Sequence, residues 1–547
     1  MPHCPGSHRA CYLLLGFLLS ACANEPPKQR APRAEESAVE NKVLTMPAMQ
    51  AAQRVMADAA NYAPLPPPRG VMPQSRERYL VTPENVLMLA SEQPVSTFSI
   101  DVDTGSYTNV RRMLNQGQLP PADAVRAEDF INYFSYAYPA PTEGKVFSIN
   151  TELAVSPWNA KRHLLKIGLQ GQMRDKEQRK AANLVFLLDV SGSMNAPEKL
   201  PLLISSLRLL TSQLDHRDRV SIVTYAGRSE TLLEPTPGDQ HGRIQMALDS
   251  LSAGGGTYGE GGILQAYQLA RTSFIKQGVN RVILATDGDF NVGMSDLDGL
   301  KALIRRQRES GVALTTLGFG SGNYNDAMME SLSNLGNGQH AYIDSINEAR
   351  KVLVDELSSS MEIIASDVKI QVEFNPALVS EYRLVGYYNR LLDREDFNND
   401  KVDAGEIGAG HSVTAIYEIA LAGSGGEQLE PLRYQQRAKK TDFANELAQI
   451  KLRYKLPLAQ KSQLITDIVT AEQLSSKDVQ DDFAFVAAVA GFAQQLKGGK
   501  YMQDSDYQTL IALAQRGIGS DPQGYRHEFI NLLKSAALLS QTSGLFE

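Results

Sequence analysis

Three oxygen-bearing side chains recur at alternate positions directly after an apolar run. They are Asp189, Ser191 and Ser193, within the letters LVFLLDVSGSM. Alternate side chains of an extended chain point to the same side, and Gly192 permits the chain to bend between the two serines. The spacing therefore predicts that one carboxylate and two hydroxyls face a common point.

Two further oxygen ligands occur in similar loops downstream. Thr257 follows three glycines, which allow its hydroxyl to approach another backbone closely, and Asp287 ends the apolar run RVILAT. Carboxylates combined with neutral oxygens suit a hard cation, and Mg²⁺ in particular completes its octahedron with water. An open position in that octahedron attracts a carboxylate from another molecule. These residues favour binding of a partner over the breaking of a bond.

Short apolar runs alternate with helical stretches around these residues, which is typical of a parallel sheet covered on both faces. Strands are expected at Leu184 to Val190, Val220 to Tyr225, Val282 to Thr286, Val312 to Phe319 and His340 to Ile343. Helices are expected at Lys199 to Leu214, Gly262 to Lys276, Leu297 to Glu309 and Ala327 to Asn334. Such a doubly wound α/β sheet places its binding site outside the carboxyl ends of its strands, where Asp189 and Asp287 occur.

In this context residues 184 to about 358 resemble a von Willebrand factor type A (VWA) domain with a metal-ion-dependent adhesion site. By that resemblance all five positions of the metal motif are present: Asp189, Ser191, Ser193, Thr257 and Asp287. The resemblance implies that the domain binds Mg²⁺ or Mn²⁺, with Mg²⁺ favoured. It also implies that a partner protein offers an acidic residue to the metal.

The N-terminus has the layout of a secretory signal peptide, with the apolar run YLLLGFLL followed by small residues. Leu19-Ser20-Ala21-Cys22 resembles a bacterial lipobox, which implies that Cys22 is lipidated and becomes the new N-terminus. Ala23 follows the cysteine at the position where lipoproteins retained in the inner membrane carry Asp. The expected location is therefore the outer membrane of the bacterial envelope, facing the periplasm. Cys4 and Cys11 would leave with the signal peptide.

The segments on both sides of the central domain alternate apolar and polar residues, as half-buried strands do. Expected strands are Ser96 to Asp103, Phe147 to Val155 and Leu164 to Leu169 before the domain, and Val368 to Phe374, Tyr382 to Tyr387, Ser412 to Ala420 and Leu447 to Tyr454 after it. We expect the two sets to close into one β-sandwich with the VWA domain inserted. From Asp481 onward the apolar spacing predicts packed helices.

The whole order resembles the bacterial YfbK family of lipoproteins over about residues 75 to 547. The resembling segments include STFSIDVDTGSYTNVRRML, EDFINYFSY, DVSGSM, GGGT, ATDGDFNVG and DAGEIGAGHSVTAIYEI. The expected division is a signal peptide at 1–21, a lipidated Cys and Pro-rich tether at 22–75, an N-terminal family segment at 76–180, the VWA domain at 181–360 and a C-terminal β and helical domain at 361–547.

Composition narrows the classes of function. The apolar share of 43% and charged share of 21% are those of a globular chain. The net charge of −8 argues against a nucleic-acid partner, because a nucleic-acid binder carries a basic face. No segment after the signal peptide has the roughly 18 continuous apolar residues of a membrane span, so the lipid is the only expected membrane anchor.

Two other motifs suggest different chemistry. Asp103 begins a DTGS sequence like that of aspartic proteases, but those enzymes need a second such loop and this chain has no other DTG. An acidic cluster has calcium-like spacing, but Lys401 and Ile407 stand where an EF-hand has Gly and Glu. Its members are Asp396, Asn398, Asp400 and Asp403. We interpret the first motif as structural and the second as an exposed polar turn.

The histidines and the single tryptophan do not form a catalytic arrangement. His163, His340 and His411 are isolated beside strand patterns, and no nucleophile elbow accompanies them. Trp158 follows a proline and is expected to pack in a core. Two hypotheses are favoured: an envelope lipoprotein that binds a partner protein through a metal, and a structural scaffold for envelope assembly that needs no metal. Neither makes the protein an enzyme. An enzymatic role is a third possibility, for which no arrangement of residues in the sequence provides support.

Overall fold

The computed structural model describes most of the chain after the first 75 residues. The described ranges are 76–81, 83–100, 103–173, 179–288, 297–356, 362–430, 443–457, 459–475, 481–502 and 505–543. All of them belong to the compact unit Pro73–Glu547. The signal peptide, Cys22 and the tether lie outside the described residues.

The central domain is built on a six-stranded sheet with the order β10-β9-β8-β5-β6-β7. The strands are β5 (Ala182–Asp189), β6 (Arg219–Tyr225), β7 (Ser229–Pro237), β8 (Val279–Thr286), β9 (Ala313–Phe319) and β10 (His340–Ile343). Five strands pair in parallel, as predicted, and β7 adds an antiparallel edge strand that the sequence pattern did not identify. The sheet is therefore mixed rather than wholly parallel.

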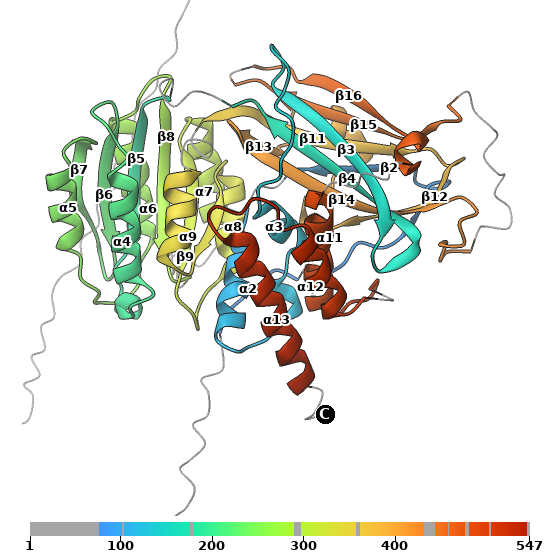
Figure 1. Ribbon diagram of the computed structural model, residues 1–547. Coiled ribbons are helices and arrows are strands. Elements are labelled where there is room, and N and C mark those ends of the chain that lie inside the picture. The colour runs from blue at the N-terminus through green and yellow to red at the C-terminus, as the bar shows by residue number, and fades with distance from the viewer. Residues whose placement is uncertain are drawn as a thin grey trace, which may run out of the picture. The chain divides into compact units, whose positions relative to one another are not determined.

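Helices cover both faces of this sheet (Figure 1). On one face lie α4 (Leu200–Thr211), α5 (His241–Asp249) and α9 (Ile346–Arg350), and on the other α6 (Glu260–Thr272), α7 (Leu297–Glu309) and α8 (Asp326–Leu335). Strand β5 is continuously apolar because both of its faces are covered by helices. Phe186 packs with the first set of helices, whereas Val185 and Leu187 pack with the second. The predicted VWA fold is confirmed.

Strands from both sides of the central domain form two further sheets. One sheet has the order β1-β12-β14-β4-β3 and consists of β1 (Met88–Leu89), β3 (Phe147–Ser156), β4 (Asn159–Gly171), β12 (Val379–Val385) and β14 (Ser412–Leu421). The other contains β2 (Val95–Ser99), β11 (Ile363–Phe374), β13 (Gly405–Gly408), β15 (Glu446–Lys455) and β16 (Gln463–Thr470). Because β4 pairs with β14 and β2 with β11, the central domain is an insertion. The two sheets share one apolar core, as expected of a sandwich.

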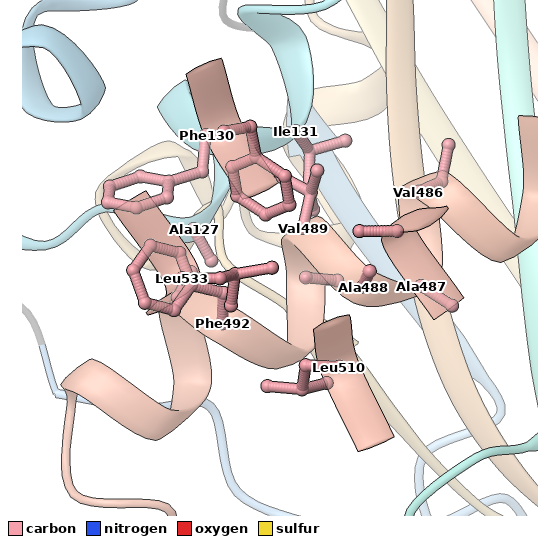
Figure 2. Packing of buried hydrophobic residues seen from close by; sticks show 14 of the residues in the cluster. Ala127, Phe130, Ile131, Val486, Ala487, Ala488, Val489, Phe492, Leu510 and Leu533 are labelled. Carbon is pink, nitrogen blue, oxygen red and sulfur yellow. The ribbon is translucent and has the colours of Figure 1, made fainter. Parts of the chain in front are cut away.

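A helical core completes the flanking part. It combines α2 (Gly105–Asn115) and α3 (Ala127–Asn132) with α11 (Asp481–Leu496), α12 (Tyr507–Arg516) and α13 (Tyr525–Ser543). Figure 2 shows Phe130 and Ile131 of α3 packed around Val489 and Phe492 of α11. Short helical turns are η1 (Ala122–Ala124), η3 (Gly192–Asn195), η4 (Lys351–Asp355), η5 (Tyr388–Arg390), η6 (Arg394–Asn398) and η7 (Ala471–Ser475). The expected C-terminal helices are confirmed.

One predicted strand is shorter than its apolar alternation suggested. The sequence predicts a strand through Asp103, but β2 ends at Ser99 and helix α2 begins at Gly105. The alternation of buried and exposed residues did not predict the strand end correctly, because Asp103 is buried by a contact with another element and not by strand pairing. Its carboxylate accepts a hydrogen bond from the backbone N–H of His340 at 2.8 Å, which joins the start of α2 to strand β10.

Buried ion pairs connect the flanks to the inserted domain. Arg126, immediately before α3, contacts Asp326 and, at 3.1 Å, Glu330, both on α8. Arg111 on α2 contacts Asp344 at 2.6 Å and Glu348 of α9 at 2.8 Å. Removing either arginine would leave buried carboxylates without their cation, so these contacts hold the two parts of the described chain together.

Candidate functional site

The DxSxS segment lies at the carboxyl end of β5, at the centre of the mixed sheet. Asp189 is the last residue of the strand, and Ser191 keeps an extended backbone with φ −63° and ψ 164°. The chain then turns into η3, so the extended course predicted through Ser193 ends two residues earlier. The turn nevertheless brings the Ser193 hydroxyl to 3.1 Å from the Ser191 hydroxyl. The two predicted hydroxyls therefore do converge.

The glycine loop lies directly against this segment. The backbone N–H of Gly254 donates to the carbonyl of Val190 at 2.8 Å, and that of Gly192 donates to Gly255 at 3.0 Å. Gly255 has a φ of +84°, a conformation that glycine adopts without strain. These bonds place Thr257 on the loop beside the serines. Its side chain is half-buried and forms no hydrogen bond to any residue within the described ranges.

Asp189 is fully buried and held by hydrogen bonds from Ser191, Tyr225 and Thr286. One carboxylate oxygen accepts the backbone N–H of Ser191 at 2.9 Å. The other accepts the hydroxyl of Tyr225 at 3.2 Å and that of Thr286 at 3.0 Å. Burial raises the pKa of Asp189, the bonds from Ser191 lower it, and the nearby charge of Asp287 raises it further, so that the net shift is upward. The two predicted carboxylates are thus close enough for the charge of Asp287 to raise the pKa of Asp189.

Asp287 has a buried cationic partner that sequence reasoning missed. The ammonium of Lys199, immediately before α4, lies 2.8 Å from an Asp287 carboxylate oxygen and 3.3 Å from the side-chain oxygen of Asn323. A Cβ built on Gly320 would lie 2.3 Å from the Lys199 stem, so this glycine makes room for the lysine. Burial would raise the pKa of Asp287, but Lys199 and the hydrogen bonds from Ser193 and Asn323 hold it below its ordinary value.

The donor set fits a hard divalent cation. Asp189, Ser191, Ser193 and Asp287 present only oxygen atoms, which suit Mg²⁺ or Mn²⁺ better than softer metals. Within the described residues no group of three or more His, Cys, Asp or Glu side chains is arranged as metal ligands. A metal at this site would therefore meet two carboxylates and neutral hydroxyls, with the positive charge of Lys199 beside one carboxylate.

The other sequence motifs have structural partners. Asp103 of the DTGS motif is buried and contacts Arg390 at 3.4 Å as well as the His340 backbone. In the acidic cluster, Asp403 pairs with Arg308, and the Asp400 carbonyl accepts from the ammonium of Lys455 at 2.6 Å. These contacts support the interpretation of the DTGS motif as structural and of the acidic cluster as a polar turn at the surface.

The histidines and Trp158 also lie in packed environments. His340 is buried between the hydroxyl of Thr316 at 3.0 Å and that of Tyr324 at 2.7 Å. Burial lowers the pKa of both His163 and His411. The buried indole of Trp158 packs in the helical core and donates to Glu418 at 3.2 Å.

A segment N-terminal to the sandwich also reaches the edge of the candidate site, which the sequence patterns did not indicate. The backbone N–H of Arg76 donates to Gly322 at 2.8 Å, and that of Arg78 donates to Tyr324 at 2.9 Å. This segment therefore runs beside the loop that carries Asn323, the contact of Lys199. The sequence signal was only the alternation of charges in SRERYL.

None of the helices in the described part of the chain combines the length and hydropathy that a membrane crossing requires.

Comparisons with known proteins agree with this architecture. Residues 183–355 match the von Willebrand factor type A domain, residues 73–166 match a von Willebrand factor model, and residues 359–539 match the model for the C-terminal part of the uncharacterized protein YfbK. The protein YfbK of Escherichia coli K12 is 45% identical over 468 residues, which are 84% of this chain and 81% of that protein.

More distant relatives share parts of the chain. The uncharacterized protein sll0103 of Synechocystis is 24% identical over 307 residues, 55% of this chain and 68% of that protein. Among solved structures, a von Willebrand factor type A protein from Catenulispora acidiphila aligns with a TM-score of 0.39 at 15% identity, covering 70% of this chain and 88% of that one.

Proposed function

Because the chain belongs to the YfbK family of proteins with a central VWA domain, we propose that this domain binds a partner protein through a divalent metal ion. VWA domains are generally interaction modules rather than enzymes. The proposed ligands are Asp189, Ser191, Ser193, Thr257 and Asp287, and the proposed ion is Mg²⁺ in preference to Mn²⁺. The observation that carries the proposal is the convergence of the two serine hydroxyls between the ends of β5 and β8.

When bound, the metal would supply a positive centre with an open position for an acidic side chain of the partner. The chain's own residues prepare that position. Tyr225 and Thr286 fix one oxygen of Asp189, which limits the orientations that the carboxylate can adopt. The hydrogen bonds from Gly192 to Gly255 and from Gly254 to Val190 hold the serine segment against the glycine loop that carries Thr257. Such preorganisation reduces the entropy lost on binding.

The proposed location is the periplasmic face of the bacterial outer membrane, with a lipid on Cys22 as anchor. The support is the Leu19-Ser20-Ala21-Cys22 motif followed by Ala23. We expect the wild-type chain to incorporate labelled palmitate and to fractionate with outer membranes. A Cys22→Ser variant that still incorporates palmitate would contradict this assignment.

A metal-independent scaffold for envelope assembly is the alternative, because a VWA domain can also support assembly through its surface alone. One experiment separates the two functions. Partners are captured with wild-type protein and with Asp189→Ala, each with and without chelator, and Asp239→Ala serves as an exposed-carboxylate control. Metal-dependent binding predicts that partners are retained only by wild type and the control without chelator. Identical partner sets in all samples would establish the scaffold instead.

Direct metal binding provides the second measurement. Calorimetric titration with Mn²⁺ should give a single site in wild type and none in Asp189→Ala. Because Asp189 is buried, circular dichroism must first show that the variant is folded. Ser193→Ala, which removes one hydroxyl and leaves the carboxylates, should weaken Mn²⁺ binding in a folded protein even if Asp189→Ala fails to fold.

A further inference from the structure

A groove of about 1100 Å³ adjoins the candidate metal site. Two of its lining residues connect the two features. Gly288 directly follows Asp287, and Asn323 contacts the Lys199 ammonium that pairs with Asp287. The remaining walls come from helices α7 and α8, from residues 76–80 and from η5. A ligand held at the metal site would therefore lie at one end of this groove.

The groove is strongly basic. Arg76 and Arg78 line it from the N-terminal segment, and Lys301 and Arg305 line it from α7. Within the described ranges none of these four cations is held in an ion pair, and three of the four are exposed. The single carboxylate in the lining is Glu330, which contacts Arg126 at 3.1 Å. The groove is therefore a basic region on a chain whose net charge is −8.

The backbone that carries the N-terminal arginines is held in place. Arg76 and Arg78 alternate with Glu77, so an extended backbone sends them to the side opposite its carboxylate. Glu77 is itself anchored, because its carboxylate accepts from Arg112 at 3.0 Å and from the backbone N–H of Gly322 at 2.9 Å. The main chain of the segment is bound to residues 322–325. The fold therefore places two cations beside the candidate metal site, and no described residue forms an ion pair with either of them.

We propose that this groove binds a run of acidic residues in the same partner protein that offers a carboxylate to the metal site. The proposal rests on the proposed function and extends it to the class of sequence recognised. One carboxylate would reach the metal, and neighbouring carboxylates of the same segment would face the four cations that line the groove. The continuity of groove and metal site favours an acidic peptide over a phosphate polymer, since both regions then receive the same chemical group from one chain.

The test measures binding of a fluorescently labelled peptide of ten glutamates to the purified full chain, with a ten-glutamine peptide as control. Two double variants remove the groove charges: Arg76→Gln with Arg78→Gln, and Lys301→Gln with Arg305→Gln. Arg306→Gln is the matched control, because Arg306 is exposed on the same helix α7 but does not line the groove. All variants are titrated with Mn²⁺ in parallel.

We expect the glutamate peptide to bind in Mg²⁺ and each double variant to weaken that binding by about fivefold, as the loss of two exposed charge contacts implies. The control should stay within about twofold, and added chelator should weaken binding to wild type. The proposal is overturned if the double variants bind as wild type does, if chelator has no effect on binding, or if inorganic polyphosphate binds more tightly than the peptide. Failure of the proposed function is seen separately, as absence of Mn²⁺ binding to wild type.

Discussion

Lys199 gives the candidate site a positive charge of its own before any metal arrives. Its ammonium lies where it neutralises Asp287, one of only two carboxylates in the donor set. A buried carboxylate without a cation is costly, so the lysine stabilises the metal-free domain. The same charge opposes a divalent ion through electrostatic repulsion. We expect Lys199 to set the balance between stability without metal and affinity for metal.

Replacing this lysine tests that balance. Lys199→Met retains most of the apolar stem and removes the charge. We expect Mn²⁺ to bind about three- to tenfold more tightly, because about 1 kcal/mol of electrostatic competition is lost. The melting temperature in chelator should fall, since Asp287 remains buried without its cation. Unchanged Mn²⁺ affinity measured by calorimetry would show that the lysine does not compete with the metal.

Glu406 should make stability depend on pH. It lies on β13 beside Arg281, and Asn337 donates to it at 2.8 Å. Burial raises the pKa of Glu406 from 4.5 to about 8, although Arg281 lowers it. Between these values the folded chain holds a proton that the unfolded chain has released, so this residue's contribution to stability falls as pH rises from about 5 to 8.

Glu406→Gln isolates that contribution. The melting temperature of the variant relative to wild type should increase between pH 5 and pH 8, with a change in unfolding free energy on the order of 2 kcal/mol. Glu395→Gln, at an exposed position of η6, should show a constant difference across the same range. A flat profile for Glu406→Gln would mean that the carboxyl ionises as easily in the folded chain as in the unfolded one.

At the scale of elements, the sequence predicted the motif strands best because each is buried on both faces and continuously apolar. Strand β7 was not predicted, because its buried and exposed residues alternate irregularly. Helix α2 was not predicted, because the apolar alternation of the preceding strand continues along the sequence into the DTGS motif, where the helix begins. Local patterns gave no sign of Lys199 and only a weak charge alternation around Arg76, because both reach the site through tertiary packing.

Helix α11 is the centre of the helical core. Its residues from Phe483 to Gln494 are all buried, so the helix is apolar around its whole circumference. The ring of Phe492 lies 6.1 Å from that of Phe130 on α3 and 5.6 Å from that of Phe529 on α13, measured between centroids. One side chain of α11 thus links the N-terminal and C-terminal helices of the flank (Figure 2).

Phe492→Ala should lower the free energy of unfolding by about 3–5 kcal/mol, because a large buried side chain is replaced by a cavity. Leu538→Ala on α13, where the side chain is 66% exposed, should change it by less than about 0.5 kcal/mol. Urea denaturation followed by circular dichroism measures both values. Similar losses in the two variants would indicate that α11 does not organise the helical core.

At the scale of the whole molecule, the order of strands before and after the central domain predicted a sandwich with an insertion. The prediction succeeded because complementary half-buried strands need partners, and both flanks supplied them. The contacts that join insertion and host were not predictable. Arg111, for example, contacts Asp344 and Glu348 in one distant part of the sequence and Glu528 in another.

Arg111→Met should uncouple the inserted domain from the helical core. Two buried carboxylates lose their cation, which costs about 3–5 kcal/mol, and most of that loss falls on the junction. We expect calorimetric unfolding to separate into two transitions. Glu528→Gln removes only the partly exposed partner, 43% accessible, and should retain one transition. A single transition at lower temperature for Arg111→Met would instead show that other contacts couple the parts.

The pairing of β4 with β14 imposes an order on biosynthesis. Trp158, beside β4, contacts Glu418, which is made 260 residues later. The first strands of the sandwich therefore emerge from the ribosome long before the strands that pair with them. All six strands of the central sheet are synthesised during that interval. The inserted domain can therefore fold before the sandwich is complete. A chain that folds from the N-terminus onward thus completes the VWA domain first and the sandwich that carries it last.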